Sequence, residues 1–227
     1  MLFRSSIGDR AVDCVGTGGD GFNTINISTA AAIVTTAAGA RVIKHGNRSA
    51  SSKSGSADVL EALGININLK AEGVGECVRK IGIGFAFAPN FHPAMRFAAP
   101  ARKALGQPTI FNILGPLANP ARPKAAAIGV ARSEFLPIVA GVLARRNCEG
   151  FVFRGAGGLD EISISTATTI LQISQGKIRE EILVITELGI PTYSIAELRG
   201  GEASENADRI RKVFNGAQGA EIGRAHV

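Results

Sequence analysis

Four glycines stand within six residues between positions 16 and 21, in the order Gly-Thr-Gly-Gly-Asp-Gly. An apolar run at 11–15 precedes them with the length of a buried strand, and hydroxyl and amide side chains follow from Asn23 to Thr29. Glycine accepts positive φ and lets backbone N–H groups approach an anion. A helix N-terminus adds unpaired N–H donors and a favourable dipole. The order of strand, glycine loop and hydroxyl-rich helix start therefore predicts a phosphate-binding loop.

Two common kinds of phosphate loop fit this stretch poorly. The spacing of Gly16, Gly18 and Gly21 matches the dinucleotide-binding fingerprint, but that motif opens its helix inside the glycines and places an acidic residue about 20 positions later. A P-loop needs Gly-Lys-Ser/Thr, which the sequence lacks. Asp20 favours a polyphosphate that carries a metal ion, because a bare carboxylate would repel phosphate. The alternative is a glycine-rich turn that binds nothing.

A second polar loop, at 44–56, follows the strand expected at 41–44. It holds two lysines, one arginine, five serines and Asn47. Ligands of open α/β sheets bind beyond the carboxyl ends of the strands, so both loops belong at one edge. Each charge-assisted hydrogen bond to phosphate contributes roughly 1.5–3 kcal/mol. A solvated linker is the alternative, but the helix expected at 56–63, with Ser56 as N-cap and Gly64 as its stop, anchors the loop.

The composition is that of a globular protein with 227 residues, 45% of them hydrophobic and 19% charged. The net charge is +6 and the sequence pI about 9.6, yet the basic residues are scattered and no nucleic-acid-binding motif appears. We therefore expect anionic small substrates and no nucleic acid. Cys14, Cys77 and Cys148 lie far apart, which is typical of reduced thiols. No apolar run reaches membrane-spanning length, so a cytoplasmic protein with no membrane partner is expected.

Apolar runs alternate with helical patterns, which predicts an α/β fold with a mostly parallel central sheet and flanking helices. Strands are expected at 11–15, 41–44, 66–69, 83–88, 125–130 and 150–154, and helices at 28–38, 56–63, 71–81, 93–105, 133–146 and 203–215. Gln175 and Gly176 predict a hairpin turn at the sheet edge. Most of the nine prolines fall within 89–123, which predicts a helical crossover toward another domain.

The domain prediction is a single α/β domain over 1–221, interrupted at 89–123, with a non-native tail at 222–227 that lacks apolar periodicity and a cap. Because the chain starts almost directly on its first core strand, we expect both ends to be truncated. Truncation would expose apolar surface, so we also expect this chain alone to be poorly soluble and nearly inactive.

Six motifs together resemble those of the anthranilate phosphoribosyltransferase family, in family order up to about residue 218. They are Gly-Thr-Gly-Gly-Asp-Gly at 16–21, Asn-Ile-Ser-Thr at 26–29, Lys-His-Gly-Asn-Arg-Ser-Ala-Ser-Ser at 44–52, Ser-Ala-Asp-Val-Leu-Glu-Ala-Leu-Gly at 56–64, Phe-Asn-Ile-Leu-Gly-Pro-Leu at 111–117 and Leu-Asp-Glu at 159–161. The family fold sets this α/β domain beside a smaller helical domain that forms a homodimer. On that pattern most of the helical domain would precede Met1, leaving 89–123 as its remnant.

The resemblance implies the site residues. Phosphoribosyl pyrophosphate would be held by Gly16, Gly19, Asp20, Thr24, Asn26, Ile27, Ser28, Thr29, Lys44, His45, Gly46, Asn47, Arg48, Ser49, Ala50, Ser51, Ser52 and Ser56. Anthranilate would contact Gly16, Asn47 and Arg102, and two Mg²⁺ ions would be held by Ser28, Asp160 and Glu161. The full-length protein would be a homodimer, possibly joined by anthranilate synthase.

The chemistry of these residues agrees with the implied roles. Mg²⁺ prefers oxygen ligands and uses few from the protein, so a hydroxyl and an adjacent Asp-Glu pair suffice. A solvated acidic turn is the alternative for Asp160 and Glu161. The planar guanidinium of Arg102 suits a carboxylate, with a surface arginine as the alternative. His92 could line the same pocket or be structural. Gly157-Gly158 and Arg154 depart from the family pattern and weaken the detail of the acceptor side.

The reaction implied is displacement at the anomeric carbon of ribose by the amine of anthranilate, with loss of pyrophosphate. No general acid or base is assigned, because an arylamine loses its proton easily after attack. A pyrimidine-nucleoside phosphorylase shares the architecture and is the nearest alternative. A phosphate-binding fragment without turnover is an alternative of another class.

Overall fold

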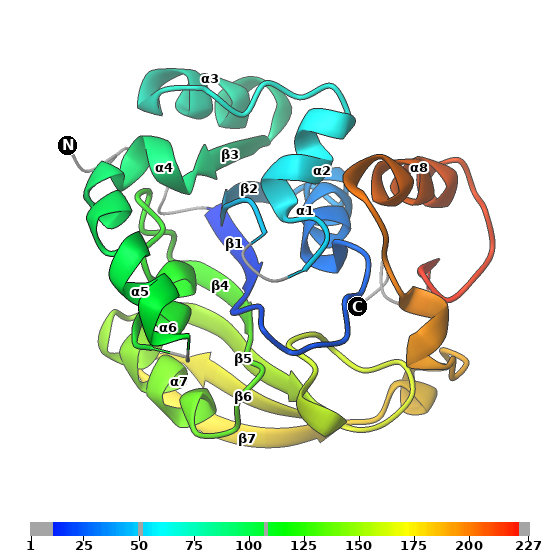
Figure 1. Cartoon of the computed structure of the whole chain (residues 1–227). Helices are drawn as coiled ribbons and strands as arrows, with labels where there is room; N and C mark the ends of the chain where they lie inside the picture. The colour runs from blue at the N-terminus through cyan, green and yellow to red at the C-terminus, as the bar shows by residue number, and fades with distance from the viewer. Residues whose placement is uncertain (1–10, 50–51, 107–108, 223–227) are drawn as a thin grey trace.

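Seven strands form the single sheet of the computed structural model, which describes residues 11–49, 52–106 and 109–222. The strands are β1 Ala11–Gly16, β2 Arg41–Gly46, β3 Ile83–Phe87, β4 Ala125–Gly129, β5 Glu149–Gly155, β6 Thr168–Ser174 and β7 Lys177–Leu183. Their order is β3-β2-β1-β4-β5-β6-β7 (Figure 1). The first five are parallel, whereas β6 and β7 add an antiparallel hairpin. The predicted α/β class with a mostly parallel sheet is therefore confirmed.

Helices connect the parallel strands and cover the sheet (Figure 1). They are α1 Ile27–Ala37, α2 Ser56–Ala62, α3 Ala71–Ile81, α4 Ala88–Phe91, α5 Ala99–Leu105, α6 Phe111–Leu117, α7 Phe135–Arg145 and α8 Ala203–Phe214. Short 3₁₀ turns lie at Pro93–Phe97, Ala156–Gly158, Ile185–Leu188 and Ile195–Leu198. The predicted helices at 28–38, 56–63, 71–81, 133–146 and 203–215 are thus present with small shifts of their ends.

The core follows the two-residue period of the strands. In β2, Val42 and Ile43 point to opposite faces of the sheet, and both are fully buried because helices cover both faces. Val42 packs with Ala32 of α1 on one face, and Ile43 packs with Val78 of α3 on the other. Helix α7 covers the same face as α3 further along the sheet, against β4, β5 and β6. Strands buried on both faces read as continuous apolar runs, which is why the sequence shows them clearly.

Two predicted elements differ from the structure. Residues 66–69, expected as a strand, form an irregular connection between α2 and α3. Ile67 is buried there, but the parallel sheet ends at β3. Residues 66–69 therefore have no neighbouring strand with which to form backbone hydrogen bonds, although their polarity alternates as in a strand. The helix expected at 93–105 is divided into the 3₁₀ turn Pro93–Phe97 and α5, because Pro100 lacks the N–H that a continuous helix would use.

The turn at Gln175 and Gly176 is confirmed as the link between β6 and β7. Both residues have positive φ, 51° and 74°, which matches a two-residue hairpin turn of type I′. β7 is the edge strand, as expected.

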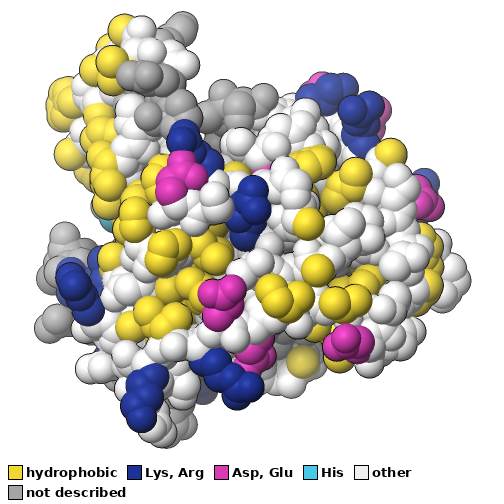
Figure 2. Space-filling model, turned by 90° about the horizontal axis from the view of Figure 1, so that it is seen from below, with side chains coloured by type: hydrophobic (Ala, Val, Ile, Leu, Met, Phe, Trp, Pro, Cys, Tyr) yellow, Lys and Arg dark blue, Asp and Glu magenta, His cyan; other side chains and the backbone are white. Residues whose placement is uncertain are grey.

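Surface and thiol properties agree with the composition. Cys14, Cys77 and Cys148 are free, and Cys14 and Cys148 are buried. Figure 2 shows one face of the molecule, on which Lys and Arg side chains lie in separate small groups among hydrophobic and acidic ones. Within the described ranges, no helix combines the length and the apolar character needed to cross a bilayer.

Candidate functional site

The glycine loop leaves the end of β1 in a conformation that only glycine adopts easily. Gly18, Gly19 and Gly21 have φ values of 68°, 76° and 78°. The loop is tied to the neighbouring strand, because Thr17 N donates to the carbonyl of Gly129 at 3.0 Å and Thr17 Oγ1 accepts from Ala131 N at 3.1 Å. The backbone of this loop therefore stands over the carboxyl ends of β1 and β4.

The acidic loop at 159–161 lies directly on three strand-end glycines. A Cβ added at Gly16 would overlap the Asp160 carboxylate, and one at Gly129 would overlap the Asp160 carbonyl oxygen. A Cβ at Gly155 would lie 2.8 Å from the carbonyl oxygen of Glu161. These glycines end β1, β4 and β5, three adjacent strands. Their missing side chains leave the space in which Asp160 and Glu161 sit.

Asp160 joins this acidic loop to the glycine loop. Its Oδ2 accepts a hydrogen bond from Gly18 N at 2.6 Å, and its side chain is almost fully buried. Burial raises the pKa of the Asp160 carboxyl well above its ordinary value, and the neighbouring carboxyls of Glu161 and Asp20 raise it further. The site therefore gathers acidic groups whose mutual repulsion a cation would relieve.

The second loop is organised by carboxylates of α2. Asp58 Oδ2 accepts from Gly55 N at 2.8 Å and from Ser49 N at 3.2 Å, and Asp58 Oδ1 accepts from Arg48 at 2.7 Å. Gly55, and not the expected Ser56, is therefore the N-cap of α2. Partial burial opposes ionisation of Asp58, but these hydrogen bonds hold the pKa of its carboxyl below the ordinary value. Ser56 Oγ instead donates to the carbonyl of Asn47 at 3.3 Å.

Arg48 of this loop bonds to α2, whereas two of the loop's serines bond to each other. The guanidinium of Arg48 pairs with Asp58 and also with Glu61 at 2.5 Å, and it lies over the ring of Phe87. Ser49 Oγ contacts the Ser52 hydroxyl at 2.7 Å. The described part of the loop is therefore anchored to the helix that follows it, as expected from its position.

Lys44 lies beneath both loops and is buried. Its Nζ donates to the carbonyl of Cys14 at 2.6 Å and to Ser28 Oγ at 3.0 Å. Burial lowers the pKa of Lys44, while the charges of Asp13 and Glu161 oppose that shift. Lys44 therefore connects the end of β2 to the start of α1, where Ser28 stands.

His45 is the next residue and is buried as a neutral ring. Burial, followed by the neighbouring His92, lowers its pKa to about 4. Its Nδ1 lies 3.2 Å from the carbonyl of Gly115, and its ring meets His92 edge-on with centroids 5.2 Å apart. His92 Nε2 in turn lies 2.8 Å from the carbonyl of Ala118. Both histidines thus connect the sheet to the segment that carries α4 and α6.

The remaining predicted residues are distributed along the same edge. Gly19 and Asn47 are exposed, Asp20 accepts from Phe22 N at 3.1 Å, and Thr24 forms an isolated bridge with Arg199. Ile27 and Thr29 are buried at the start of α1, where they face the protein interior. Gly46 lies at the end of β2, and an added Cβ there would overlap Ser56 Oγ.

The two phosphate loops meet at Asn26, whose Nδ2 donates to the carbonyl of Ser54 at 3.2 Å. Ala50 and Ser51 lie outside the described residues. Arg102 belongs to α5, but its side chain is not among the described ones.

Sequence reasoning missed several residues that shape this site. Asp13 is buried in β1 and accepts from Asn119 Nδ2 at 2.8 Å. Burial raises its pKa to about 6, against the opposing effects of Asn119 and Lys44. Asn119 also donates to the carbonyl of Ile43 at 2.8 Å. Gly129 carried a usable signal, because it ends an apolar strand. Asp13 and Asn119 carried no such signal, since an isolated polar residue does not indicate in the sequence which residue it will bond.

The donor set fits a magnesium ion held jointly with a substrate. Asp160, Glu161 and Ser28 carry oxygen atoms of the kind that Mg²⁺ prefers, and the charge of Glu161 acts on Lys44, which bonds Ser28. Among the described residues, no group of three or more His, Cys, Asp or Glu side chains forms a complete metal centre. Mg²⁺ is usually bound through one or two carboxylates together with substrate phosphates.

The chain belongs to the glycosyl transferase family, because the profile of that family's a/b domain matches residues 8–225. It is 56% identical over 215 residues to an anthranilate phosphoribosyltransferase of Nocardia farcinica, covering 95% of this chain and 62% of that protein. It is 54% identical to the protein of the same name from Rhodococcus jostii, covering 94% and 59%.

Solved structures agree with these relatives. The anthranilate phosphoribosyltransferase of Thermus thermophilus superposes with a TM-score of 0.89 at 42% identity, covering 95% of this chain and 64% of the other. The Saccharomyces cerevisiae protein, solved in complex with PRPP and Mg, gives a TM-score of 0.82 at 32% identity, covering 89% and 56%. The chain thus spans about three fifths of the length of the curated relatives it matches.

Proposed function

We propose that the protein transfers the 5-phosphoribosyl group of phosphoribosyl pyrophosphate to the amine of anthranilate and releases pyrophosphate. This chain would supply the α/β domain that binds the phosphoribosyl donor. The names of the relatives favour this reaction over a pyrimidine-nucleoside phosphorylase. The observation that carries the proposal is the contact of Gly18 N with Asp160 Oδ2, because it brings the glycine loop and the acidic pair to one edge of the sheet.

The chain's own residues would act mainly by positioning. The N–H groups of the glycine loop and the start of α1 face the same edge, where they would bind phosphate oxygens. Lys44 holds the Ser28 hydroxyl, and Asp58 holds the backbone of the second loop. Such fixed donors lower the barrier without rearranging during the reaction. At the reacting carbon, the bond to the pyrophosphate oxygen breaks, the bond to the amine nitrogen forms, and the amine releases a proton.

Magnesium, bound through Ser28, Asp160 and Glu161, would neutralise negative charge on the leaving pyrophosphate. We propose two ions per site, as the family resemblance implies; the relative from Saccharomyces cerevisiae was solved with Mg. Removal of the metal by a chelator is then expected to abolish turnover.

The acceptor side would involve Gly16, Asn47 and Arg102. Gly16 ends β1 beside Asp160, and Asn47 is exposed at the end of β2. A yeast relative solved with 4-fluoroanthranilate supports an aromatic acid as the acceptor; it superposes with a TM-score of 0.83 at 30% identity, covering 95% of this chain and 60% of the other. We further propose that segment 89–123 belongs to a smaller helical domain, and that the full-length protein is a cytoplasmic homodimer with anthranilate synthase as a candidate partner.

The test of the reaction is product analysis with the full-length protein. Phosphoribosyl pyrophosphate and anthranilate should give phosphoribosylanthranilate and pyrophosphate, whereas thymidine and phosphate should give no reaction. Asp160→Asn combined with Glu161→Gln should abolish magnesium-dependent turnover and leave the fold intact. The matched control is Glu180→Gln with Glu181→Gln, an adjacent acidic pair on the edge strand β7. Unchanged rates in the first double variant would remove both carboxylates from the metal site.

Arg102→Ala tests the acceptor side separately. If Arg102 binds the anthranilate carboxylate, the KM for anthranilate should rise by about tenfold or more, as expected for losing a charge-assisted pair, while the KM for phosphoribosyl pyrophosphate changes little. Arg79→Ala, which removes an exposed arginine from α3, serves as the control. Equal increases in both KM values would mean that Arg102 positions something else.

A further inference from the structure

Asn206 of α8 contacts both phosphate loops although it is far from them in the sequence. Its Nδ2 donates to Asn26 Oδ1 and to Ser54 Oγ, each at 2.9 Å. Its Oδ1 accepts from Gly201 N at 2.8 Å. The side chain is only 1% exposed. A single buried amide therefore bridges the end of the glycine loop and the end of the second loop.

The hydrogen bonds fix the orientation of this amide. Both N–H donors of the Asn206 amide are used, and its oxygen accepts a hydrogen bond. A flipped amide would place two acceptor oxygens, Asn206 Oδ1 and Asn26 Oδ1, against each other, so the observed orientation is the favourable one. Ser54 Oγ completes the cluster, lying 3.4 Å from Asn26 Oδ1 and 3.3 Å from the carbonyl of Gly201. A buried polar cluster that is fully hydrogen-bonded holds its members in one arrangement.

The helix that carries Asn206 packs on α2, and the segment before this helix pairs with the exit of the glycine loop. Ala207 and Ile210 are fully buried against Val59 of α2. The segment before α8 pairs with the loop exit, through Ile25 N to the Leu198 carbonyl at 2.9 Å and Gly200 N to the Asn23 carbonyl at 2.7 Å.

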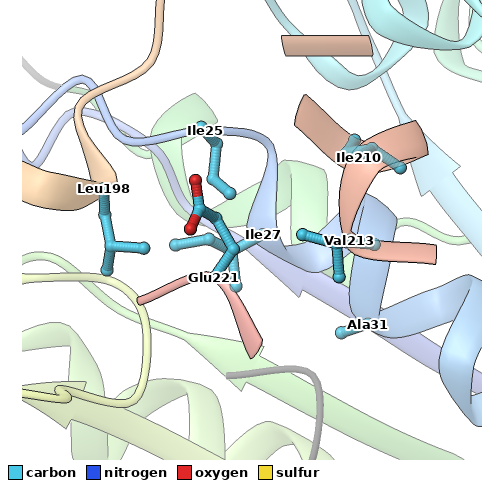
Figure 3. Close-up of a pocket in the computed structure, with 8 residues that line it drawn as sticks. Ile25, Ile27, Ala31, Leu198, Ile210, Val213 and Glu221 are labelled. Carbon is cyan, nitrogen blue, oxygen red and sulfur yellow. The ribbon is translucent and has the colours of Figure 1, made fainter. Parts of the chain in front are cut away.

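Figure 3 shows the apolar side of the same junction. Ile25 and Ile27 from the loop exit face Leu198, Ile210 and Val213 around a small pocket. The position of the amide thus follows from rigid packing on both sides.

We propose that Asn206 is a positioning residue for the phosphoribosyl donor, holding the glycine loop and the second loop at the separation that lets one pyrophosphate contact both. This inference rests on the proposed function. A ligand that bridges two loops must otherwise immobilise them on binding, and that cost reduces affinity. Asn206 bonds Asn26 and Ser54 and none of the proposed acceptor residues, so it should affect the donor more than the acceptor.

The experiment compares Asn206→Asp and Asn206→Leu with the wild type in the full-length protein. Both variants keep the approximate volume; the first turns two donors into acceptors and the second removes all hydrogen bonds. We expect the Kd of magnesium–phosphoribosyl pyrophosphate, measured by calorimetry, and its KM to rise by about tenfold to a hundredfold, the range for losing buried hydrogen bonds. The KM for anthranilate should stay within about twofold, a difference too small to reflect a lost contact. Asp208→Asn, on the exposed side of α8, is the control.

A second, ligand-free measurement separates this inference from the proposed function. Amide hydrogen exchange at residues 23–26 and 52–55 should be faster in both Asn206 variants, because the loops open independently. Ser54→Ala removes the hydroxyl from the same cluster and should shift donor affinity in the same direction by a smaller factor, so a poorly folding Asn206 variant leaves the inference testable.

Normal donor affinity in folded variants, or equal increases of both KM values, would overturn the positioning role. A wild type that does not bind the donor would overturn the proposed function, and with it the donor role of Asn206, even if the exchange result holds.

Discussion

The glycine loop and the second loop stand at one edge of the sheet but are shaped by different means. The glycine loop is shaped by backbone: Gly18, Gly19 and Gly21 take positive φ, and Asp160 approaches over Gly16 where no side chain intervenes. The second loop is shaped by side chains, since Asp58 caps its end and binds Arg48. The first loop depends mainly on glycine backbone, and the second also requires the carboxylate of Asp58.

This difference predicts different sensitivities. A methyl group added at Gly16, where the glycine loop begins, should disrupt the site, because the Asp160 carboxylate already fills that space. The second loop should fail when a carboxylate is removed.

Gly129→Ala is expected to have the largest effect. Its Cβ would overlap the carbonyl oxygen of Asp160, so the acidic loop must move. We expect a stability loss of about 1–3 kcal/mol from overpacking and a decrease in kcat/KM of about a hundredfold from misplaced groups. Thermal unfolding and steady-state kinetics measure both.

Gly141→Ala is the matched control, since no atom lies within 4 Å of its added Cβ in α7. It should stabilise the protein by about 0.5–1 kcal/mol, the helix preference of alanine over glycine. Full activity in Gly129→Ala would contradict the inference that activity requires Asp160 in its present position over Gly129.

Asp58→Ala should have an intermediate effect. It removes the acceptor for Gly55 N and Ser49 N and frees Arg48, so the second loop loses its anchor. We expect a stability loss of about 1–2 kcal/mol, as for a lost helix cap, and a KM for phosphoribosyl pyrophosphate raised by about tenfold. Glu76→Ala, which removes an exposed ion pair on α3, should leave stability and the KM nearly unchanged. Similar results for the two variants would mean that the second loop keeps its shape without Asp58.

A change of pH is expected to have the smallest net effect on stability. Two buried groups beneath the second loop, Asp13 and His45, make the free energy of unfolding change with pH in opposite directions. The pKa of Asp13 rises from 3.8 to about 6, so between these values the folded state binds more protons than the unfolded state, and stability falls as pH rises. The pKa of His45 falls from 6.5 to about 4, so the unfolded state binds more protons, and stability rises with pH. In the wild type these two contributions should nearly cancel between pH 4 and 6.

Single variants separate the two contributions. His45→Gln should leave a stability that decreases from pH 4 to 6, and Asp13→Asn one that increases from pH 4 to 6.5, each relative to the wild type by up to about 3 kcal/mol. Urea unfolding at several pH values measures both slopes. If stability changed with pH in the same direction in both variants, Asp13 and His45 would not be the groups whose contributions cancel.

Most of the fold was predictable because its signals are local. The buried strands and the hairpin turn at Gln175 follow from residue periods and backbone preferences over a few positions. The strand expected at 66–69 shows the limit of that approach, since alternation specifies a strand only when a partner strand lies alongside. The N-cap expected at Ser56 was wrong by one residue because the carboxylate of Asp58 reaches back to Gly55 N.

The sequence alone determined the glycine spacing of the first loop, the polar composition of the second and the acidic pair at 160–161, since these are features of short segments. Only the tertiary structure decided that Asp160 rests on Gly16 and Gly129, and that Asn206 bonds Asn26. Those partners lie up to 180 positions apart. The order and register of the strands bring these partners into contact. The local conformational preference of one residue does not specify the position of a residue far away in the sequence.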